Sequence, residues 1–119
     1  MARDIHPDMA DLVRLEEGWP ANLTLAEERA AWREFCLANN RPCPRSIEVE
    51  NTAIGDAGHR VPVRIYRPHP GRPAPCFVYI HGGGWILGDL DTNDSIAWGF
   101  ADETGATVVS VDYRLAPEH

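Results

Sequence analysis

The most constraining feature of this 119-residue sequence is a short apolar run that leads directly into three consecutive glycines. Residues 76–80 read Cys-Phe-Val-Tyr-Ile, a pattern typical of a strand covered on both faces of a sheet. His81 and Trp85 flank the three glycines. Glycine has no Cβ and adopts positive φ values readily, so such a loop lets backbone amides approach a bound molecule. The sequence therefore predicts a buried strand that ends in a backbone-lined loop.

The residues after this loop predict a helix and a second buried strand. The helix is expected to run through residues 96–101 and to end before Gly105. The residues able to cap its start are Thr92, Asn93 and Asp94. Residues 107–111 (Thr-Val-Val-Ser-Val) then form the second strand. A strand–helix–strand order implies a right-handed crossover within a parallel sheet.

The first third of the sequence is predicted to be helical. One helix is expected over residues 8–19, where Pro20 interrupts it. A second helix is expected after Thr24, because Glu27 three residues later completes a capping box, and it should continue to about Asn39.

The middle of the sequence predicts a β-hairpin. Residues 47–54 contain apolar positions expected in a first strand, and residues 55–58 (Gly-Asp-Ala-Gly) have the composition of a turn. Apolar and other side chains alternate over residues 61–66, which indicates a second, half-buried strand.

Composition excludes several classes of protein. The formal net charge of −7 argues against a nucleic-acid partner. No apolar run approaches the roughly 20 residues needed to span a bilayer, and the start of the sequence lacks the pattern of a signal peptide. Three cysteines without a C-x-x-C pair indicate neither a disulfide framework nor a zinc site. We therefore expect a cytoplasmic protein without a metal or cofactor.

The glycine loop itself suggests acyl-transfer chemistry. Ester cleavage passes through a tetrahedral intermediate whose oxygen becomes an anion, and preorganised backbone N–H groups stabilise that charge. A His-Gly-Gly-Gly loop after a strand is one known way to place such a donor. Two other interpretations are a plain glycine-rich turn and a dinucleotide-binding loop, although the spacing does not match G-x-G-x-x-G.

A second motif closes the sequence, because residues 112–119 read Asp-Tyr-Arg-Leu-Ala-Pro-Glu-His directly after the last predicted strand. H-G-G-G-W followed by D-Y-R-L-A-P-E-H resembles the hormone-sensitive-lipase-like (bacterial family IV) esterases, also called α/β-hydrolase fold-3. The resemblance spans residues 47–119 by motif and order, and more loosely the helical first third. It implies the N-terminal half of an α/β-hydrolase fold, with residues 1–44 as a helical cap segment and 45–119 as part of the catalytic domain.

The resemblance also implies roles for individual residues. Gly83 and Gly84 would donate their backbone N–H groups to the oxyanion, with Gly82 and His81 supporting the loop. His81 would anchor the loop through side-chain hydrogen bonds rather than act as the catalytic histidine. Trp85 would form a wall of the substrate pocket; the alternative is that it is an ordinary core residue. Arg114 and Glu118 would act as structural brackets; for Arg114 the alternative is a solvated surface charge.

The catalytic triad of such enzymes is not found in this sequence. The family places its nucleophilic serine on a G-x-S-x-G elbow, and the serines present, Ser46, Ser95 and Ser110, all lack that context. The resemblance therefore implies an ester hydrolase acting on a small-molecule ester, with this chain inactive alone. The alternatives are a non-catalytic ligand-binding member of the fold and a truncated product without activity.

The resemblance also implies an order for the strands. In the family's sheet, residues 107–111 lie between the strand over 61–65 and the strand over 76–80. Residues 76–80 would then form an open, apolar edge in this chain. Uncharged apolar edges invite pairing with other chains, so we expect marginal stability together with self-association or the need for a partner that carries the rest of the fold.

Overall fold

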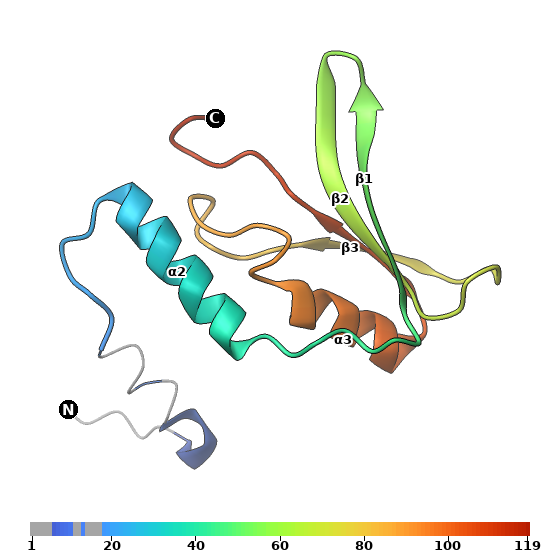
Figure 1. The fold of residues 1–119 in the computed structure, drawn as a ribbon, viewed down its shortest axis with the longest axis horizontal. Helices are drawn as coiled ribbons and strands as arrows, with labels where there is room; N and C mark the ends of the chain where they lie inside the picture. Colours follow the sequence, from blue (N-terminus) through green and yellow to red (C-terminus); the bar gives the residue numbers. More distant parts are fainter. Residues whose placement is uncertain (1–5, 11–12, 14–17) are drawn as a thin grey trace.

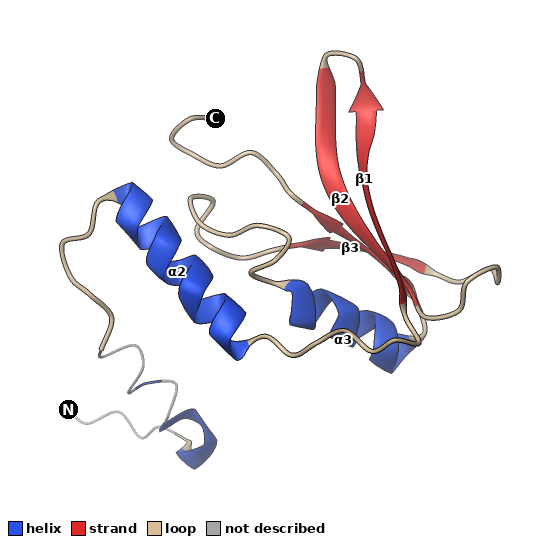
Figure 2. Ribbon diagram, viewed as in Figure 1, coloured by secondary structure: helices blue, strands red, loops and turns tan. Residues whose placement is uncertain are grey.

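The computed structural model describes residues 6–10, 13 and 18–119 and arranges them as a four-stranded sheet with helices beside it (Figures 1 and 2). In chain order the elements are η1 (Pro7–Met9), α2 (Leu25–Asn39), β1 (Glu48–Asp56), β2 (His59–Arg67), β3 (Cys76–Ile80), α3 (Asp94–Thr104) and β4 (Thr107–Val111).

The helix α2 confirms the sequence prediction, including its capping box. The Oγ1 of Thr24 accepts a hydrogen bond from the N–H of Glu27, and the Thr24 N–H donates to Oε2 of Glu27 at 2.8 Å. These two bonds satisfy amides that a helix start otherwise leaves unpaired. Half of the helix predicted over residues 8–19 lies outside the described residues; those described there include part of the 3₁₀ turn η1 and the helical residues Ala10 and Val13.

The predicted hairpin is present, but its strands run further toward the turn than expected. Gly55 and Asp56 belong to β1 and His59 opens β2, so only residues 57–58 form the turn. The Asp56 carboxylate accepts the N–H groups of Gly58 at 3.0 Å and His59 at 3.1 Å. This side-chain bonding closes the turn, and the hairpin projects beyond the rest of the sheet (Figure 1).

The strand order is β1-β2-β4-β3, which confirms that β4 lies between β2 and β3. β3 and β4 pair in parallel, as expected for strands joined by a helix. β2 pairs with β4 in the antiparallel sense, so the complete sheet is mixed. The carboxyl ends of β3 and β4 therefore meet the start of β2 at one edge, and the glycine loop leaves the sheet there.

The core lies between α3 and one face of the sheet (Figure 2). Its buried members are Ile47, Tyr66, Ala97, Trp98, Ala101 and Val108. Tyr66 falls on the face of β2 that the alternation pattern assigned to the polar side, yet it is fully buried. Its hydroxyl donates to Oδ1 of Asp94 at 2.6 Å, which satisfies the polar group inside the core.

The prediction that residues 76–80 are covered on both faces is wrong for this structure. Phe77 and Tyr79 pack against Phe100 of α3, whereas Val78 and Ile80 on the opposite face are each 57% exposed. The reason is that β3 is an edge strand and no described helix packs on its second face. Among the described residues, no helix is both long and apolar enough to cross a membrane.

Candidate functional site

The glycine loop turns sharply immediately after β3. Gly83, Gly84 and Trp85 all have positive φ values, of 130°, 60° and 68°. The carbonyl of Gly83 accepts the N–H groups of Ile86 at 3.1 Å and Leu87 at 2.9 Å, which closes the turn. A Cβ on Gly83 would lie 2.2 Å from the backbone oxygen of Leu87, so only glycine fits this position.

The N–H groups of Gly83 and Gly84 have no hydrogen-bond partner among the residues that the structure describes. Gly82 and Gly84 are exposed and Gly83 is half-buried, so the loop is open to a bound molecule. A Cβ placed on Gly82 or Gly84 would meet nothing within 4 Å. The loop thus presents two consecutive unpaired donors beside open space.

His81 supports the loop from inside the protein. Its side chain is 3% exposed and stacks on the ring of Tyr113 with centroids 4.3 Å apart. His81 Nδ1 lies 2.8 Å from the carbonyl oxygen of Gly82, so Nδ1 carries the proton in this contact. The ring also passes close to Gly88, where a Cβ would lie 2.5 Å from Nδ1. The requirement for glycine at position 88 was not predicted from the sequence, because it follows from a contact rather than from a motif.

Trp85 lies at the surface and is 67% exposed. The alternative that it is an ordinary core residue is therefore wrong. Its ring contacts Tyr113 at 5.3 Å, and its carbonyl accepts the N–H of Ala116 at 2.9 Å. A bulky residue with positive φ is uncommon, and it persists where surrounding contacts hold the backbone in place.

Arg29 of α2 joins the glycine loop to the C-terminal segment. Its Nε donates to the carbonyl of Ile86 at 2.9 Å and its Nη2 to the carbonyl of Ala116 at 2.8 Å. Its guanidinium also pairs with both carboxylate oxygens of Glu118, each at 2.8 Å. Glu118 thus makes a bracketing contact, whereas Arg29 was not identified from the sequence. No local pattern links two residues that lie 89 positions apart.

A second ionic cluster fixes the far end of the loop. Arg33 of α2 pairs with Asp89 and with Asp91, the latter at 2.6 Å. Arg64 of β2 pairs with the same Asp91 at 2.8 Å and with Asp94 at 2.6 Å. Hydrogen bonds from Arg33 and Arg64 lower the pKa of Asp91 despite its partial burial. Residues 82–93 are therefore tied to α2 through Arg29 near their start, and to both α2 and β2 through Arg33 and Arg64 near their end.

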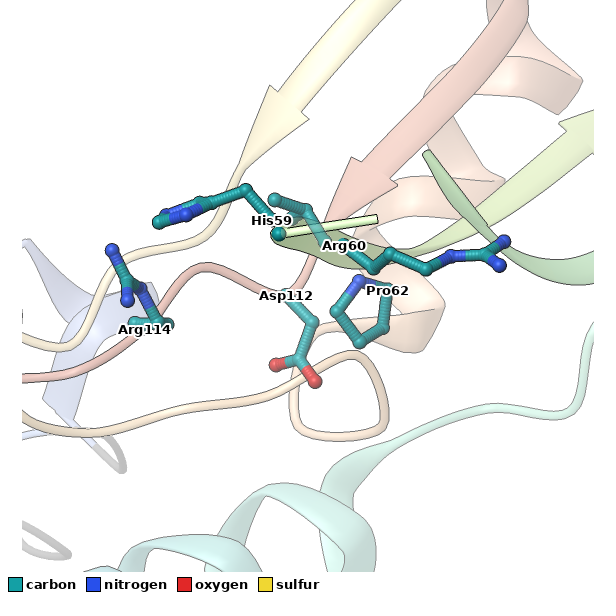
Figure 3. Close-up of a pocket in the computed structure, with 7 residues that line it drawn as sticks. His59, Arg60, Pro62, Asp112 and Arg114 are labelled. Atoms are coloured by element: carbon teal, nitrogen blue, oxygen red, sulfur yellow. The ribbon is translucent and has the colours of Figure 1, made fainter. Parts of the chain in front are cut away.

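A pocket of about 130 Å³ opens beside this region, at the same edge of the sheet (Figure 3). It is lined by residues 58–62 of the hairpin together with Asp112 and Arg114. Burial raises the pKa of Asp112, and the nearby charge of Asp89 adds to the effect. In Figure 3 the Arg114 side chain extends toward His59 while the Asp112 carboxylate points away from both. Trp85 is not among the residues that line this pocket.

Arg114 does not make the bracketing contact expected of it. Its side chain is exposed and forms no hydrogen bond or ion pair with any residue in the described ranges. The alternative of a solvated charge fits this placement better.

The serines present do not supply a nucleophile to the loop. Ser110 is fully buried in β4, and its Oγ has no partner among the described residues. The Ser95 hydroxyl donates to Oδ1 of Asn40 at 2.8 Å, so it ties α3 to the linker after α2. Within the described part of the chain, no group of three or more acidic, histidine or cysteine residues is arranged to hold a metal ion.

Comparison with known proteins places this loop and its fold in one family. A family model described as the α/β hydrolase fold matches residues 77–119. The chain is 45% identical to an ethyl acetate hydrolase of Pseudomonas putida over 96% of its own length and 40% of that protein. It is 51% identical to the carboxylesterase NlhH of Mycobacterium tuberculosis over 95% of its length and 37% of that protein.

A solved structure agrees with these sequence matches. An ester hydrolase from the metagenome of Lake Arreo superimposes with a TM-score of 0.83 at 31% identity, covering 97% of this chain and 39% of the other. The chain thus spans about two fifths or less of each of these three relatives. With its partial sheet and the matching residues of β3, the glycine loop, α3 and β4, the chain has part of the α/β hydrolase fold and is similar to the hormone-sensitive-lipase-like members of that family.

Proposed function

We propose that this chain supplies the oxyanion-binding loop of a carboxylic-ester hydrolase. In this proposal residues 1–44 form a helical cap segment and residues 45–119 form part of the catalytic domain. The observation that carries the proposal is the pair of unpaired N–H groups on Gly83 and Gly84, in a loop whose carbonyls at residues 82, 83, 85 and 86 all accept hydrogen bonds. The ester hydrolases to which the chain is similar support the choice of an ester as substrate class.

The chemistry follows from the charge that develops during ester cleavage. Attack on the carbonyl carbon moves an electron pair onto the carbonyl oxygen, and the resulting anion needs donors already in position. Two adjacent amides held by a rigid turn meet this need without reorganisation. Loss of one such donor typically costs about 3 kcal/mol of transition-state stabilisation, a rate factor of roughly a hundredfold or more.

Other residues of the loop have supporting roles in this proposal. His81 fixes the Gly82 carbonyl through Nδ1 and is itself held by the Tyr113 ring. Glu118 stabilises the loop through Arg29. Trp85, exposed next to the free amides, lines the approach to them for the acyl or alcohol group.

Binding of a stable tetrahedral anion tests the proposal directly. O-ethyl methylphosphonate is a monoanion that resembles the intermediate, and its titration should shift the ¹⁵N–¹H resonances of Gly83 and Gly84. Gly83→Ala should abolish these shifts, because its Cβ would clash with the Leu87 carbonyl. Gly82→Ala is the matched control, since open space surrounds that position. Phosphonate shifts spread over the surface, or unchanged in Gly83→Ala, would contradict the proposal.

The chain by itself is proposed to lack turnover, because its 119 residues contain no G-x-S-x-G elbow. Hydrolysis of p-nitrophenyl acetate by the purified chain should not exceed that of its Gly83→Pro variant. Turnover well above this control would overturn the assignment of an incomplete site. A second candidate is a non-catalytic ligand-binding protein of the same fold, and a coding sequence that continues past His119 without an elbow would support it.

We also propose that the chain self-associates through the free edge of β3. The support is the position of β3 at the end of the sheet and the exposure of its apolar side chains. Val78→Lys places a charge on this edge and should convert an associated species into a monomer in sedimentation velocity. Val49→Lys, at the opposite edge of the sheet, is the matched control. A monomer at all concentrations for the unmodified chain would rule the association out.

A further inference from the structure

Arg29 connects the helix α2 with the glycine loop and with the C-terminal segment. The residue lies in α2, within the proposed cap segment, while its three partners lie in the glycine loop and the C-terminal segment. The Arg29 side chain is 30% exposed, so its fork of donors is partly shielded from water. A guanidinium with all three N–H-bearing nitrogens engaged is a geometrically specific contact.

The contacts of Arg29 continue into the turn that presents the free amides. Arg29 holds the Ile86 carbonyl, while the N–H of Ile86 holds the Gly83 carbonyl at 3.1 Å. Arg29 also holds the Ala116 carbonyl, while the N–H of Ala116 holds the Trp85 carbonyl at 2.9 Å. The two peptide groups that follow Trp85 are thus linked to the Arg29 side chain, one directly through the Ile86 carbonyl and the other through Ala116.

The backbone at this point needs such support. Three consecutive residues have positive φ, and one of them is a tryptophan, which is sterically disfavoured in this conformation. Backbone of this kind persists only where several contacts hold it together. The hydrogen bonds within the loop close the turn, but the bonds from Arg29 and Ala116 are those that anchor it to other segments.

We propose that α2 controls the glycine loop through Arg29, so that the amides of Gly83 and Gly84 are presented only while α2 is docked. Arg29 is a positioning residue, because it contacts the loop and not the anion. The consequence for activity rests on the proposed function, whereas the effect on the loop conformation does not. Undocking of α2 would release the Ile86 and Ala116 carbonyls together and let the turn relax toward negative φ values.

Hydrogen exchange of the Ile86 and Leu87 amides reports directly on this turn, because both donate to the Gly83 carbonyl. In Arg29→Gln we expect these two amides to exchange about tenfold faster or more, and the Gly83 and Gly84 resonances to shift. Arg45→Gln is the matched control, since it removes the same charge from an exposed arginine with no hydrogen bond or ion pair in the described ranges. Equal exchange in Arg29→Gln and Arg45→Gln would overturn the proposal.

A charge-swapped variant separates positioning from simple anchoring. Arg29→Glu combined with Glu118→Arg restores an ion pair between α2 and the C-terminal segment but removes the donors to the Ile86 and Ala116 carbonyls. We expect α2 to stay docked while Ile86 and Leu87 still exchange rapidly. Return of both amides to the original rates would show that the ion pair alone suffices, and would overturn the proposal.

Folding and function are kept apart by two further readings. The hydrogen-exchange protection of the α3 amides reports on the fold as a whole and should be unchanged in Arg29→Gln. If Arg29→Gln lowers that protection, the comparison is repeated with the milder variant Arg29→Lys and its control Arg45→Lys. Phosphonate titration of the unmodified chain tests the proposed function separately. If the unmodified chain does not bind the phosphonate but exchange is faster in Arg29→Gln, the proposed function is overturned and the control of the loop by α2 is supported. If the phosphonate binds but exchange is unchanged in Arg29→Gln, the proposed function is supported and the control by α2 is overturned.

Discussion

The helices α2 and α3 are held in the molecule by different forces. α3 buries Ala97, Trp98 and Ala101 against the sheet, whereas α2 has no fully buried residue. α2 is instead joined to the rest of the chain by the ion pairs of Arg29 and Arg33. The contrast shows that an apolar pattern in the sequence predicts both a helix and the face by which it docks. For a helix docked by ion pairs, the sequence predicts the helix but not its docking partners. It also means that the two helices should respond differently to mutation, acid and salt.

The largest effect is expected where α3 meets the core. Trp98→Ala removes a side chain that is 7% exposed and should lower the free energy of unfolding by about 3–5 kcal/mol, since the cavity adds to the lost burial. Urea denaturation followed by circular dichroism measures it. Ile96→Ala, on the half-exposed face of α3, should change the value by about 0.5 kcal/mol or less. Similar losses in both variants would mean that α3 is not docked by burial.

The next largest effect is expected in the cluster that holds α2. Asp91→Asn removes the carboxylate shared by Arg33 and Arg64 and should cost about 1–2 kcal/mol after discounting for partial exposure. The loss should appear first as faster hydrogen exchange in α2. Glu103→Gln, an exposed acid of α3, should leave exchange in both helices unchanged. The difference between the variants should shrink in 1 M salt, because surface charges are screened.

Low pH should weaken the docking of α2 gradually and at a higher pH than it affects α3. The hydrogen bonds from Arg29 lower the pKa of Glu118 to about 2, and Arg33 and Arg64 lower that of Asp91. The folded state therefore binds fewer protons than the unfolded state, so the stabilisation is complete above the ordinary carboxyl range and is lost as the pH falls toward about 2. Amide shifts of α2 should change over this range before those of α3. Glu118→Gln should remove part of this dependence; an identical titration in that variant would contradict the assignment.

The smallest effect is expected at the start of α2. Thr24→Ala removes the capping box and should cost about 1 kcal/mol, confined to the first turn of the helix. Thr24→Ser keeps a hydroxyl and should behave like the original residue. Helix content from circular dichroism and exchange of the Glu27 and Glu28 amides measure the difference. A loss that spreads to α3 would mean that the helices are coupled more tightly than their contacts indicate.

The predictable parts of the fold are those whose signal is local. The capping box at Thr24 and Glu27, the apolar strands and the glycine after α3 all act within a few residues, and the structure confirms the elements they predict. The order of the strands was predicted from the family resemblance, and the structure confirms it as well. The burial of Tyr66 could not be predicted in this way, because it depends on which face of the sheet α3 covers, whereas the open edge at β3 was expected from the family resemblance.

In the candidate site, too, the residues of a local motif could be predicted and those that act through long-range contacts could not. The motif identified the loop, because three glycines after a strand are unusual, but it could not show what holds the loop in place. Arg29, Gly88 and Asp91 act through partners that are distant in sequence or through a close approach of rings and backbone. No spacing rule connects α2 with the C-terminal segment, so these contacts depend on the three-dimensional fold and could not be predicted from the sequence.

The two margins of the sheet differ in a way that limits how large an assembly can grow. β3 forms one margin without a charged side chain, whereas β1 at the other has Glu48, Glu50 and Asp56, of which the first two share Arg67 as their cation. Two copies that join through β3 leave a β1 strand at each outer boundary. A third copy would have to add to one of these acidic strands, and charged side chains on an edge strand oppose further pairing. If the proposed joining through β3 occurs, the acidic β1 strands would therefore favour a closed pair over a growing filament.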